Sequence, residues 1–285
     1  MLKISFDEKE RKIEEPCVLV LGGFDGLHEG HKSLLKKARE FSYSVAMMTI
    51  FDGKGSKNLF TAKEREESFE KAGIDFLLAC EFSSIREMEA EDFLDKILSI
   101  FRPVLVVCGE DFRFGKGAKG TPKTIEKKLP VFVEKLLLIE GEKVSSSLVK
   151  RRIEVGDLEG ANKLLGSPFF LKGVVEKGRG VGRKLGFPTA NLTYPQEKFP
   201  LPLGVYETEI EVEGKSYRGI TNYGARPTFL DDEVLTESYL HAFSGDLYGK
   251  ELKISFLRYL RKNRKFEKVE DLIDQLKEDV RSIEI

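Results

Sequence analysis

Apolar runs of strand length alternate with helical patterns in the first half of the chain, and this alternation restricts the possible fold more than any other feature. The runs are 17–21, 45–50, 74–80, 104–108 and 131–139. Helical patterns separate them at 31–41, 61–72 and 90–100. This order predicts a Rossmann-like α/β domain, with a parallel sheet, right-handed crossovers and ligands at the carboxyl ends of the strands.

Two of these helical patterns carry local signals. The segment 31–41 places four apolar residues on one face, namely Leu34, Leu35, Ala38 and Phe41. The segment 61–72 opens with Thr61 and Glu64, the spacing of a capping box. Both signals predict helices that pack on the sheet.

After about residue 167 the pattern changes to short alternating strands with glycine turns. Strands are expected at 205–212, 216–220 and 252–260, with a Glu213-Gly214 turn between the first two. This is typical of an antiparallel β-barrel. A terminal helix should bury the residues at helical spacing, which are Val269, Leu272, Ile273, Leu276, Val280 and Ile283. Small helices at 146–166 join the halves.

Length, charge and cysteine usage narrow the classes of protein. A chain of 285 residues is expected to form two domains, which we place at 1–157 and 158–285. The 47 Lys+Arg against 48 Asp+Glu leave no overall field to attract nucleic acid or an anionic membrane. The three cysteines lie far apart in or beside apolar runs, which indicates reduced core thiols and a cytoplasmic protein. No signal peptide or membrane span is apparent.

The segment 22–31, GGFDGLHEGH, lies between the first predicted strand and the first predicted helix. Glycines there allow close approach to a ligand, and a helix start offers free N–H groups to phosphate oxygens. Two of the three histidines of the chain, His28 and His31, are spaced to face one triphosphate. The alternatives are a solvated surface turn or a zinc site, which would still need its remaining ligands.

Two further stretches fit a phosphate site. GEDFRFG (109–115) follows a predicted strand, so Arg113 could meet phosphate, and Phe112 or Phe114 could stack on a ring. VSSSLVKRR (144–152) places hydroxyls at a helix start before three cations. Simple N-capping explains the serines equally well, but beside the histidine turn they indicate a second phosphate clamp.

In the second half, a glycine-rich basic loop runs from Gly178 into LGFPTANL (185–192). Such a loop suits a polyphosphate, but its spacing matches neither a Walker A loop nor a dinucleotide-binding GxGxxG. In the PTAN core, Thr189 and Asn191 offer the hard oxygens that Mg²⁺ prefers.

Taken in order, GxFDGxHxGH, GEDFRFG, VSSS, LGFPTANL, NYGARPTF (222–229), LYGK (247–250) and LR…KF (260–266) resemble the prokaryotic bifunctional riboflavin kinase and FMN adenylyltransferase family, or FAD synthetases. The resemblance implies an N-terminal FMN adenylyltransferase domain and a C-terminal riboflavin kinase barrel. Riboflavin would be phosphorylated to FMN, and FMN adenylylated to FAD with release of pyrophosphate. ATP would be the co-substrate of both steps, with Mg²⁺, and the flavins riboflavin, FMN and FAD would be substrates and products.

The resemblance also implies residue roles. In the adenylyltransferase, His28 and His31 would be catalytic, and ATP would contact Gly23, Phe24, Asp25, Gly26, Gly30, Ser146, Ser147 and Lys150. FMN would contact Asp111, Phe112 and Arg113. In the kinase, Glu237 would be the base, Arg261 would bind flavin, and Thr189 and Asn191 would bind Mg²⁺. Its ATP would contact Gly178, Gly182, Lys184, Thr189 and Asn191.

The sequence departs from the family pattern in three places. TIFDGKG (49–55) replaces a TFxPHP-like stretch, Lys150 replaces an arginine, and Asn263 replaces a glutamate of the LRxExKF pattern. A lysine keeps the positive charge but cannot form the two parallel hydrogen bonds that an arginine guanidinium donates to a phosphate. We expect these changes to affect the rate of adenylyl transfer and flavin affinity more than the type of reaction.

Three alternatives stay open at this point. The chain could transfer a nucleotidyl group to another acceptor, as a cytidylyltransferase does. The barrel could bind oligonucleotides, although aromatic residues do not interleave with the basic stretch 179–184. The chain could also hold a flavin as a cofactor without turning it over.

Overall fold

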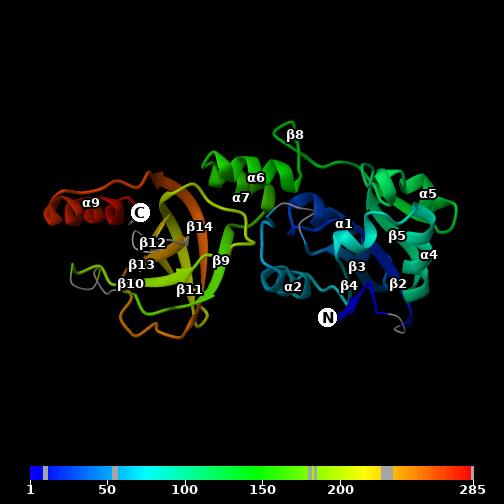
Figure 1. Ribbon diagram of the computed structural model, residues 1–285, viewed down its shortest axis with the longest axis horizontal. Coiled ribbons are helices and arrows are strands. Elements are labelled where there is room, and N and C mark those ends of the chain that lie inside the picture. Colours follow the sequence, from blue (N-terminus) through cyan, green and yellow to red (C-terminus); the bar gives the residue numbers. More distant parts are fainter. Residues whose placement is uncertain (9–11, 53–56, 179–181, 183–184, 226–233, 284–285) are drawn as a thin grey trace. The chain divides into compact units, whose positions relative to one another are not determined.

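The computed structural model describes residues 1–8, 12–52, 57–178, 182, 185–225 and 234–283. The chain forms two compact units, Met1–Ser146 (the N-terminal unit) and Ser147–Ile285 (the C-terminal unit), which Figure 1 shows in sequence colours. The units divide in the first turn of helix α6 (Ser146–Glu154). The domain boundary expected from the sequence, between residues 157 and 158, lies at the start of the next helix, α7 (Leu158–Leu165).

The N-terminal unit contains a six-stranded sheet in the order β1-β4-β3-β2-β5-β6, and all of its pairings are parallel. Its strands are β1 (Leu2–Ser5), β2 (Ile13–Leu21), β3 (Ser44–Ile50), β4 (Phe76–Cys80), β5 (Phe101–Gly109) and β6 (Val131–Glu134). Its helices are α1 (Glu29–Arg39), α2 (Ala62–Lys71), α3 (Phe82–Ile85), α4 (Ala90–Ile100), α5 (Pro122–Glu126) and the short 3₁₀ helix η2 (Lys116–Ala118). A small hairpin, β7 (Leu138–Ile139) with β8 (Glu142–Lys143), follows β6. The predicted parallel α/β fold is confirmed.

Helices cover both faces of this sheet, which explains the continuous apolar character of its central strands. One apolar cluster contains side chains of α1 and α2, and the other contains side chains of α4 and α5. The predicted capping box is present: Thr61 Oγ1 accepts from the Glu64 N–H, and the Glu64 carboxylate accepts from the Thr61 N–H. Leu34, Leu35 and Ala38 are buried as predicted.

Three sequence-based expectations for this unit need correction. The run 131–139 is not one strand, because β6 ends at Glu134 and Leu138–Ile139 pairs with β8 instead. Phe41 lies beyond the end of α1 and is exposed. The charged N-terminal segment also contributes an unexpected strand, β1, which pairs with β4.

The C-terminal unit contains a six-stranded antiparallel sheet in the order β10-β13-β12-β11-β14-β9. Its strands are β9 (Phe169–Val174), β10 (Thr189–Thr193), β11 (Gly204–Val212), β12 (Lys215–Ala225), β13 (Val234–Leu240) and β14 (Glu251–Arg261). The sheet curls until its two edges meet, since Glu176, just after β9, forms a bridge with Asn191 of β10. The predicted antiparallel barrel is confirmed.

Local sequence signals explain several of its elements. Glu213 and Gly214 form the predicted turn between β11 and β12, and both have positive φ, of 48° and 78°, as a two-residue type I′ hairpin requires. Inside the barrel, Thr208, Thr221 and Ser238 form a buried chain of hydroxyl hydrogen bonds of 2.9 and 2.8 Å across three strands. These bonds satisfy polar groups that burial would otherwise penalise.

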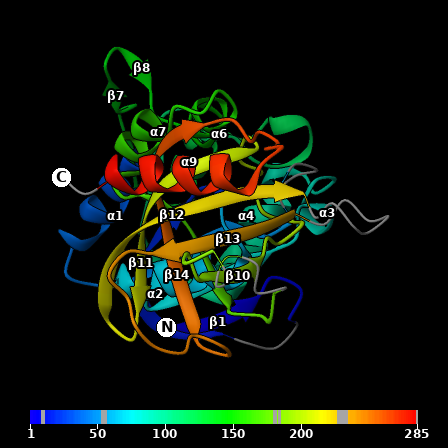
Figure 2. The ribbon, with the colours of Figure 1, turned by 90° about the vertical axis from the view of Figure 1, so that its left-hand side faces the viewer.

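The terminal helix α9 (Val269–Arg281) lies across β12, as Figure 2 shows. Val280 and Ile283 are buried against the barrel, as predicted. Val269 is 54% exposed, so its predicted place on the buried face is wrong. Polar Gln275 and Asp279 are buried instead.

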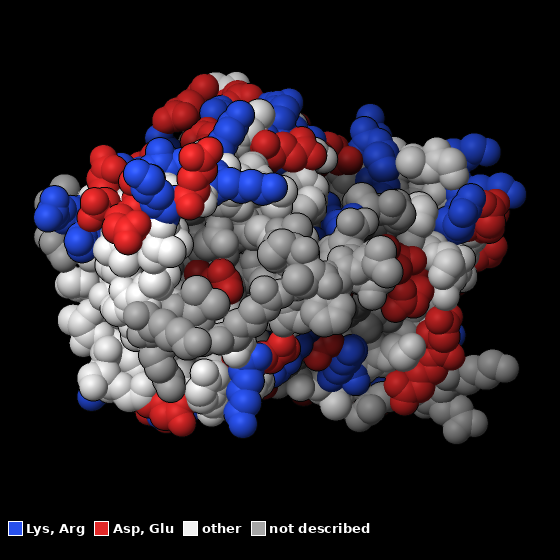
Figure 3. Space-filling view, turned by 60° about the vertical axis from the view of Figure 1, so that its left-hand side comes forward, with Lys and Arg blue, Asp and Glu red and all other residues white. Residues whose placement is uncertain are grey.

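The surface and the cysteines agree with the sequence-based interpretation. On the face that Figure 3 shows, Lys and Arg are interspersed with Asp and Glu among the described residues. Cys17, Cys80 and Cys108 are free and buried, and burial raises the pKa of Cys17 and of Cys108 to about 12. Among the described helices, none is long and apolar enough to cross a membrane.

Candidate active sites

The first site lies where the strand order of the parallel sheet reverses. After β2 the chain continues to β3 on one side, whereas β5 lies on the other side of β2. Leu21 and Cys108, the partners near the carboxyl ends of β2 and β5, precede the glycine turn and GEDFRFG respectively. Such a switch point is the expected binding crevice of an open α/β sheet.

The turn after β2 has an unusual backbone. Phe24 has a φ of 44°, although its side chain is aromatic and buried. Gly26 has a φ of 148°, and a Cβ there would lie 2.7 Å from the Phe60 ring. Positive φ is costly for a residue with a side chain, and such strain gathers at functional sites. The backbone of this turn therefore depends on its neighbours to hold it.

Both histidines are locked at the start of α1. His28 is the N-cap residue, and its Nδ1 accepts from the His31 N–H at 3.1 Å. His31 Nδ1 lies 2.7 Å from the Gly26 carbonyl oxygen and must donate to it. The two rings stack with centroids 3.5 Å apart. In their neutral forms His28 therefore carries its proton on Nε2 and His31 carries its proton on Nδ1.

Their surroundings keep both imidazoles neutral. Burial lowers the pKa of His28 to about 4, partly offset by its hydrogen bond and by Asp111. Burial, together with the neighbouring His28, lowers the pKa of His31 well below its ordinary value. Two stacked rings cannot both be charged at low cost, so the pair can take up at most one additional proton when an anion binds.

Other predicted residues approach this pair. Asp111 forms an ion pair with Lys143 of β8, and the charges of both act on His28. The Val144 carbonyl, which precedes α6, lies 3.7 Å from the position of a Cβ on Gly30. GEDFRFG and the beginning of the serine segment thus converge on the histidine turn. Lys143 was not singled out from the sequence.

The serine segment divides between the units. Ser146 ends the N-terminal unit, whereas Ser147 and Lys150 lie in the first turns of α6 in the C-terminal unit. The Lys150 ammonium lies 5.6 Å from the centre of the Phe199 ring. A role for Ser146, Ser147 and Lys150 in ATP binding stays a prediction.

The aromatic residues of GEDFRFG have separate roles. Phe114 is buried in the core and packs on Phe93, so it is not available to stack on a ligand. Phe112 is only partly buried, and its ring stacks on that of Phe114 with centroids 5.5 Å apart. Arg113 is exposed and donates to the Glu110 and Phe112 carbonyls.

One residue of the departure at 49–55, Asp52, has a defined structural role. Residues 53–56 lie outside the described residues, but Asp52 accepts from the backbone N–H groups of Phe82 and Ser83 at the start of α3. Asp52 therefore ties the end of β3 to the segment that follows β4.

The second site lies on the outer face of the barrel. Register pairs Asn191 of β10 with Glu237 of β13, and pairs Glu237 with Asn222 of β12. Residues directly opposite one another have Cβ atoms about 5 Å apart on one face. Thr189 shares this face with Asn191 because side chains alternate along a strand. Asn222 lay within NYGARPTF but could not be selected without knowledge of the register.

The glycine loop packs against PTAN wherever it is described. A Cβ on Gly178 would lie 2.2 Å from Asn191 Nδ2, and one on Gly182 would lie 2.3 Å from the Phe187 carbonyl oxygen and 3.3 Å from Thr189 Oγ1. Only glycine permits these approaches. Lys184, another predicted ATP ligand, lies outside the described residues.

The donor set on this face fits Mg²⁺. Thr189, Asn191, Asn222 and Glu237 offer hydroxyl, amide and carboxylate oxygens, which are the ligands that this ion prefers. Gly178 leaves room beside the Asn191 amide that a side chain would fill. Among the described residues, no cluster of three His, Cys, Asp or Glu side chains forms another metal site.

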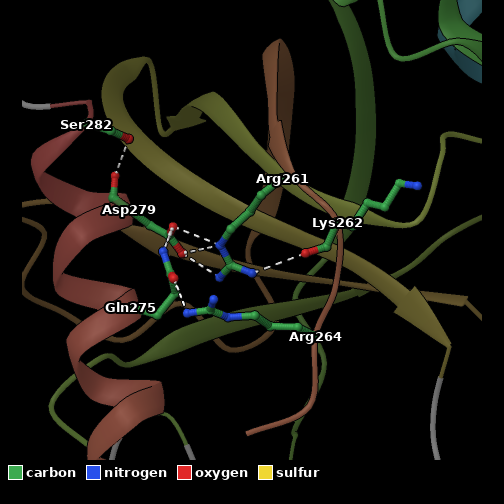
Figure 4. A network of polar contacts seen from close by, with 6 residues as sticks. All are labelled: Arg261, Lys262, Arg264, Gln275, Asp279 and Ser282. Carbon is green, nitrogen blue, oxygen red and sulfur yellow. Dashed lines mark hydrogen bonds and ion pairs between the residues drawn. The ribbon is translucent and has the colours of Figure 1, made fainter.

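Arg261, predicted to bind flavin, is engaged within the protein. Its Nη2 and Nε donate to the Asp279 carboxylate at 2.6 and 2.9 Å, and Asp279 is buried (Figure 4). Gln275 bridges Asp279 and Arg264. These contacts fasten α9 to the end of β14. Asn263, the departure from the LRxExKF pattern, donates to the Tyr223 carbonyl at the end of β12.

Comparison with known proteins links each unit to one family model. Residues 10–148 match the model for FAD synthetase, and residues 165–284 match the model for riboflavin kinase. A bifunctional riboflavin kinase/FMN adenylyltransferase from Bacillus subtilis is 33% identical, covering 92% of this chain and 90% of the relative. The Escherichia coli K12 protein of the same description is 29% identical, covering 93% of this chain and 91% of the relative.

A solved structure matches the whole fold. A crystal structure from Streptococcus pneumoniae, described as a macrolide-efflux protein, is 28% identical with a TM-score of 0.90, and the match covers 99% of both chains.

Proposed function

The chain belongs to the bifunctional riboflavin kinase/FMN adenylyltransferase family, and on that premise we propose how its residues divide the two reactions. It is an enzyme of FAD biosynthesis that uses ATP to phosphorylate riboflavin to FMN and then to adenylylate FMN to FAD. The C-terminal unit carries the kinase, and the N-terminal unit carries the adenylyltransferase.

In the kinase, Glu237 is the proposed base. Its carboxylate takes the proton of the ribityl hydroxyl while that oxygen bonds to the γ-phosphorus of ATP, the bond from γ-phosphorus to the bridging oxygen breaks, and ADP leaves. Thr189 and Asn191 bind the ATP phosphates together with Mg²⁺, which, when bound, neutralises phosphate charge. Gly178 and Gly182 let the backbone lie close to the nucleotide.

In the adenylyltransferase, a phosphate oxygen of FMN bonds to the α-phosphorus of ATP, and pyrophosphate leaves. The N-terminus of α1 and the turn from Gly23 to Gly26 bind the triphosphate, near Gly30. Neutral His28 donates from Nε2 to a phosphate oxygen, and the histidine pair takes up one proton from solvent as the phosphates bind, so that the developing charge meets an imidazolium. Asp111, Phe112 and Arg113 lie at the proposed flavin side of the site.

We propose a different role for Arg261 from the one the family resemblance implied. Its pairing with Asp279 holds α9 beside the kinase face, where Val280 and Ile283 pack with Phe187 and Tyr239. Tyr239 is the register partner of Thr189. Arg261 therefore positions the wall of the flavin site.

The proposal also covers location and partners. We infer a cytoplasmic enzyme whose partners are the small molecules riboflavin, FMN and ATP, without nucleic acid or membrane. Its buried free cysteines and the mixed charge of the face in Figure 3 support this proposal.

The observation that carries the kinase assignment is the register that places Asn191, Glu237 and Asn222 side by side. The test is a time course of purified protein with riboflavin, ATP and Mg²⁺, in which transient FMN followed by FAD is expected. Glu237→Gln should abolish FMN formation and leave FAD formation from supplied FMN intact. Glu209→Gln, an exposed glutamate of β11, is the matched control and should change neither rate.

Other outcomes would contradict the proposal. Bound flavin that never turns over would indicate a flavoprotein, and turnover of CTP but not ATP would indicate another nucleotidyltransferase. Loss of both activities in a folded Glu237→Gln variant would contradict the assignment of one reaction to each unit.

A further inference from the structure

Arg65 is a fully buried cation beneath the histidine turn, and neither the motifs nor the proposed mechanism uses it. It is the fourth residue of α2 and is completely buried. Burying an arginine is expensive unless its donors are satisfied. Within the described part of the chain, its hydrogen bonds go to carbonyl groups and one hydroxyl, and none goes to a carboxylate.

The bonds of Arg65 join the ends of two neighbouring strands. Its Nε and Nη2 donate to the Phe24 carbonyl at 3.1 and 2.8 Å, in the turn after β2. The same Nη2 donates to the Ile50 carbonyl at 2.7 Å, at the end of β3, and to Thr49 Oγ1. The Thr49 hydroxyl lies within hydrogen-bond distance of the Gly23 and Phe24 carbonyls.

Phe24 is the strained residue of this turn. Its φ is 44°, and Arg65 donates to the carbonyl oxygen of the peptide that joins Phe24 to the next residue. The Phe24 ring packs on His31 with centroids 4.5 Å apart. One guanidinium group therefore maintains the backbone on which the glycine turn and His31 depend.

The guanidinium of Arg65 is not fully hydrogen-bonded, although the charges of Asp25, Glu66 and Glu81 favour its protonated form. Its Nη1 is buried and has no hydrogen-bond partner among the described residues. The Phe51 ring lies over the guanidinium, 4.6 Å from ring centre to Cζ. A buried donor left unsatisfied costs free energy, so its retention at this place calls for a functional explanation. A positive charge beneath a turn that receives polyphosphate stabilises the bound anion.

We infer that Arg65 is a positioning residue for adenylyl transfer: it holds the Phe24 peptide in its strained conformation and places positive charge beneath the phosphates of ATP. This inference rests on the proposed function of the N-terminal unit. Arg65 acts through the turn and need not touch the substrate.

The test compares Arg65→Met and Arg65→Lys with the unsubstituted protein in FAD formation from FMN. Lysine keeps the charge, but its ammonium group cannot reproduce the planar arrangement in which the guanidinium donates hydrogen bonds to two carbonyls and a hydroxyl. Because a misplaced turn binds the triphosphate poorly, we expect the KM for ATP to rise at least about tenfold in Arg65→Met, with a smaller rise in Arg65→Lys. Lys71→Met, at the exposed end of the same helix, should leave the KM for ATP unchanged.

A merely structural role would give a different result. Loss of stability lowers the folded fraction, so the apparent kcat falls while the KM for ATP stays constant. Riboflavin phosphorylation by the same molecules provides an internal control, and its KM for ATP should not change. If Arg65→Met does not fold, Thr49→Val decides, because it removes one hydroxyl that holds the turn and leaves the charge in place.

The outcomes separate this inference from the proposed function. An unsubstituted protein that makes no FAD from FMN contradicts the proposed function. If the unsubstituted protein is active and the Arg65→Met variant keeps its KM for ATP within twofold, the role of Arg65 alone is overturned. Where Arg65→Met does not fold, the same result for Thr49→Val overturns it.

Discussion

His28 and His31 show how a small segment sets the protonation of its own side chains. Each ring uses one nitrogen for a backbone hydrogen bond within the turn, and stacking brings the rings together. Burial favours the neutral forms of both. Both rings are therefore neutral in the free enzyme, and in the proposed mechanism the triphosphate would supply the negative charge that makes one imidazolium favourable.

This arrangement predicts the titration of the free enzyme. The folded chain holds the pKa of His28 at about 4, against an ordinary value near 6.5. The unfolded chain therefore binds more protons than the folded chain between these values, and the free energy of unfolding falls as the pH drops from about 6.5 to about 4. For His28 alone the loss is about 3 kcal/mol.

NMR titration of the three histidines measures this directly. We expect His28 to titrate near pH 4 and His31 well below 6.5. The variant His28→Asn keeps an N-cap acceptor for α1 but does not titrate, so its unfolding free energy should depend less on pH in this range. Titration of both rings near 6.5 would contradict the interpretation that burial neutralises them.

At the scale of elements, α9 is held by a polar contact on its buried face. Asp279, which pairs with Arg261, and Gln275 occupy buried positions where an amphipathic helix ordinarily places apolar residues. Val280 and Ile283 add the apolar part of the interface. Because Asp279 is buried, removal of its charge would leave Arg261 without its partner in a poorly solvated place.

Asp279→Asn should therefore release α9 without unfolding the barrel. We expect docking of α9 to weaken by about 2 kcal/mol, which is about 30-fold faster amide exchange across the helix. Riboflavin phosphorylation should fall several-fold, whereas FAD formation from supplied FMN should not change. Hydrogen exchange with mass spectrometry and the two assays measure these effects.

Asp274→Asn is the matched control, because Asp274 lies on the exposed side of the same helix and pairs only with Lys277 in the described part of the chain. It should leave exchange and both activities unchanged. Equal exchange in Asp279→Asn and Asp274→Asn would show that the buried pair does not hold the helix.

Local signals explain what the sequence could predict at this scale. The sequence signals for the Thr61 capping box, the Glu213-Gly214 turn and the glycine turn each consist of residues that lie within a few positions of one another. The Asn222–Glu237 register, the Arg261–Asp279 pair and the bonds of Arg65 join distant segments. Periodicity carries no information about such pairings, so the sequence predicted α9 as an amphipathic helix without its buried polar contacts and did not predict β1.

At the scale of the whole molecule, the two chemistries belong to units with separate cores. Each unit completes its own sheet, and the apolar clusters of the first consist of residues from that unit alone. The histidine turn lies entirely within the N-terminal unit, and Thr189, Asn191 and Glu237 lie within the other. FMN, the product of the kinase reaction of the C-terminal unit, is the substrate of the reaction of the N-terminal unit.

Separate sites predict complementation between two inactive full-length chains. Glu237→Gln should lack kinase activity, and His31→Ala should lack adenylyltransferase activity, so neither alone should convert riboflavin to FAD. Mixed with riboflavin, ATP and Mg²⁺, they should make FAD after a lag, because FMN released by His31→Ala must reach Glu237→Gln through solution. Dilution of both variants should lengthen the lag, and chromatography of the flavins measures it. If each variant keeps its other activity but the mixture makes no FAD, then FMN passes between the two sites of one molecule without release.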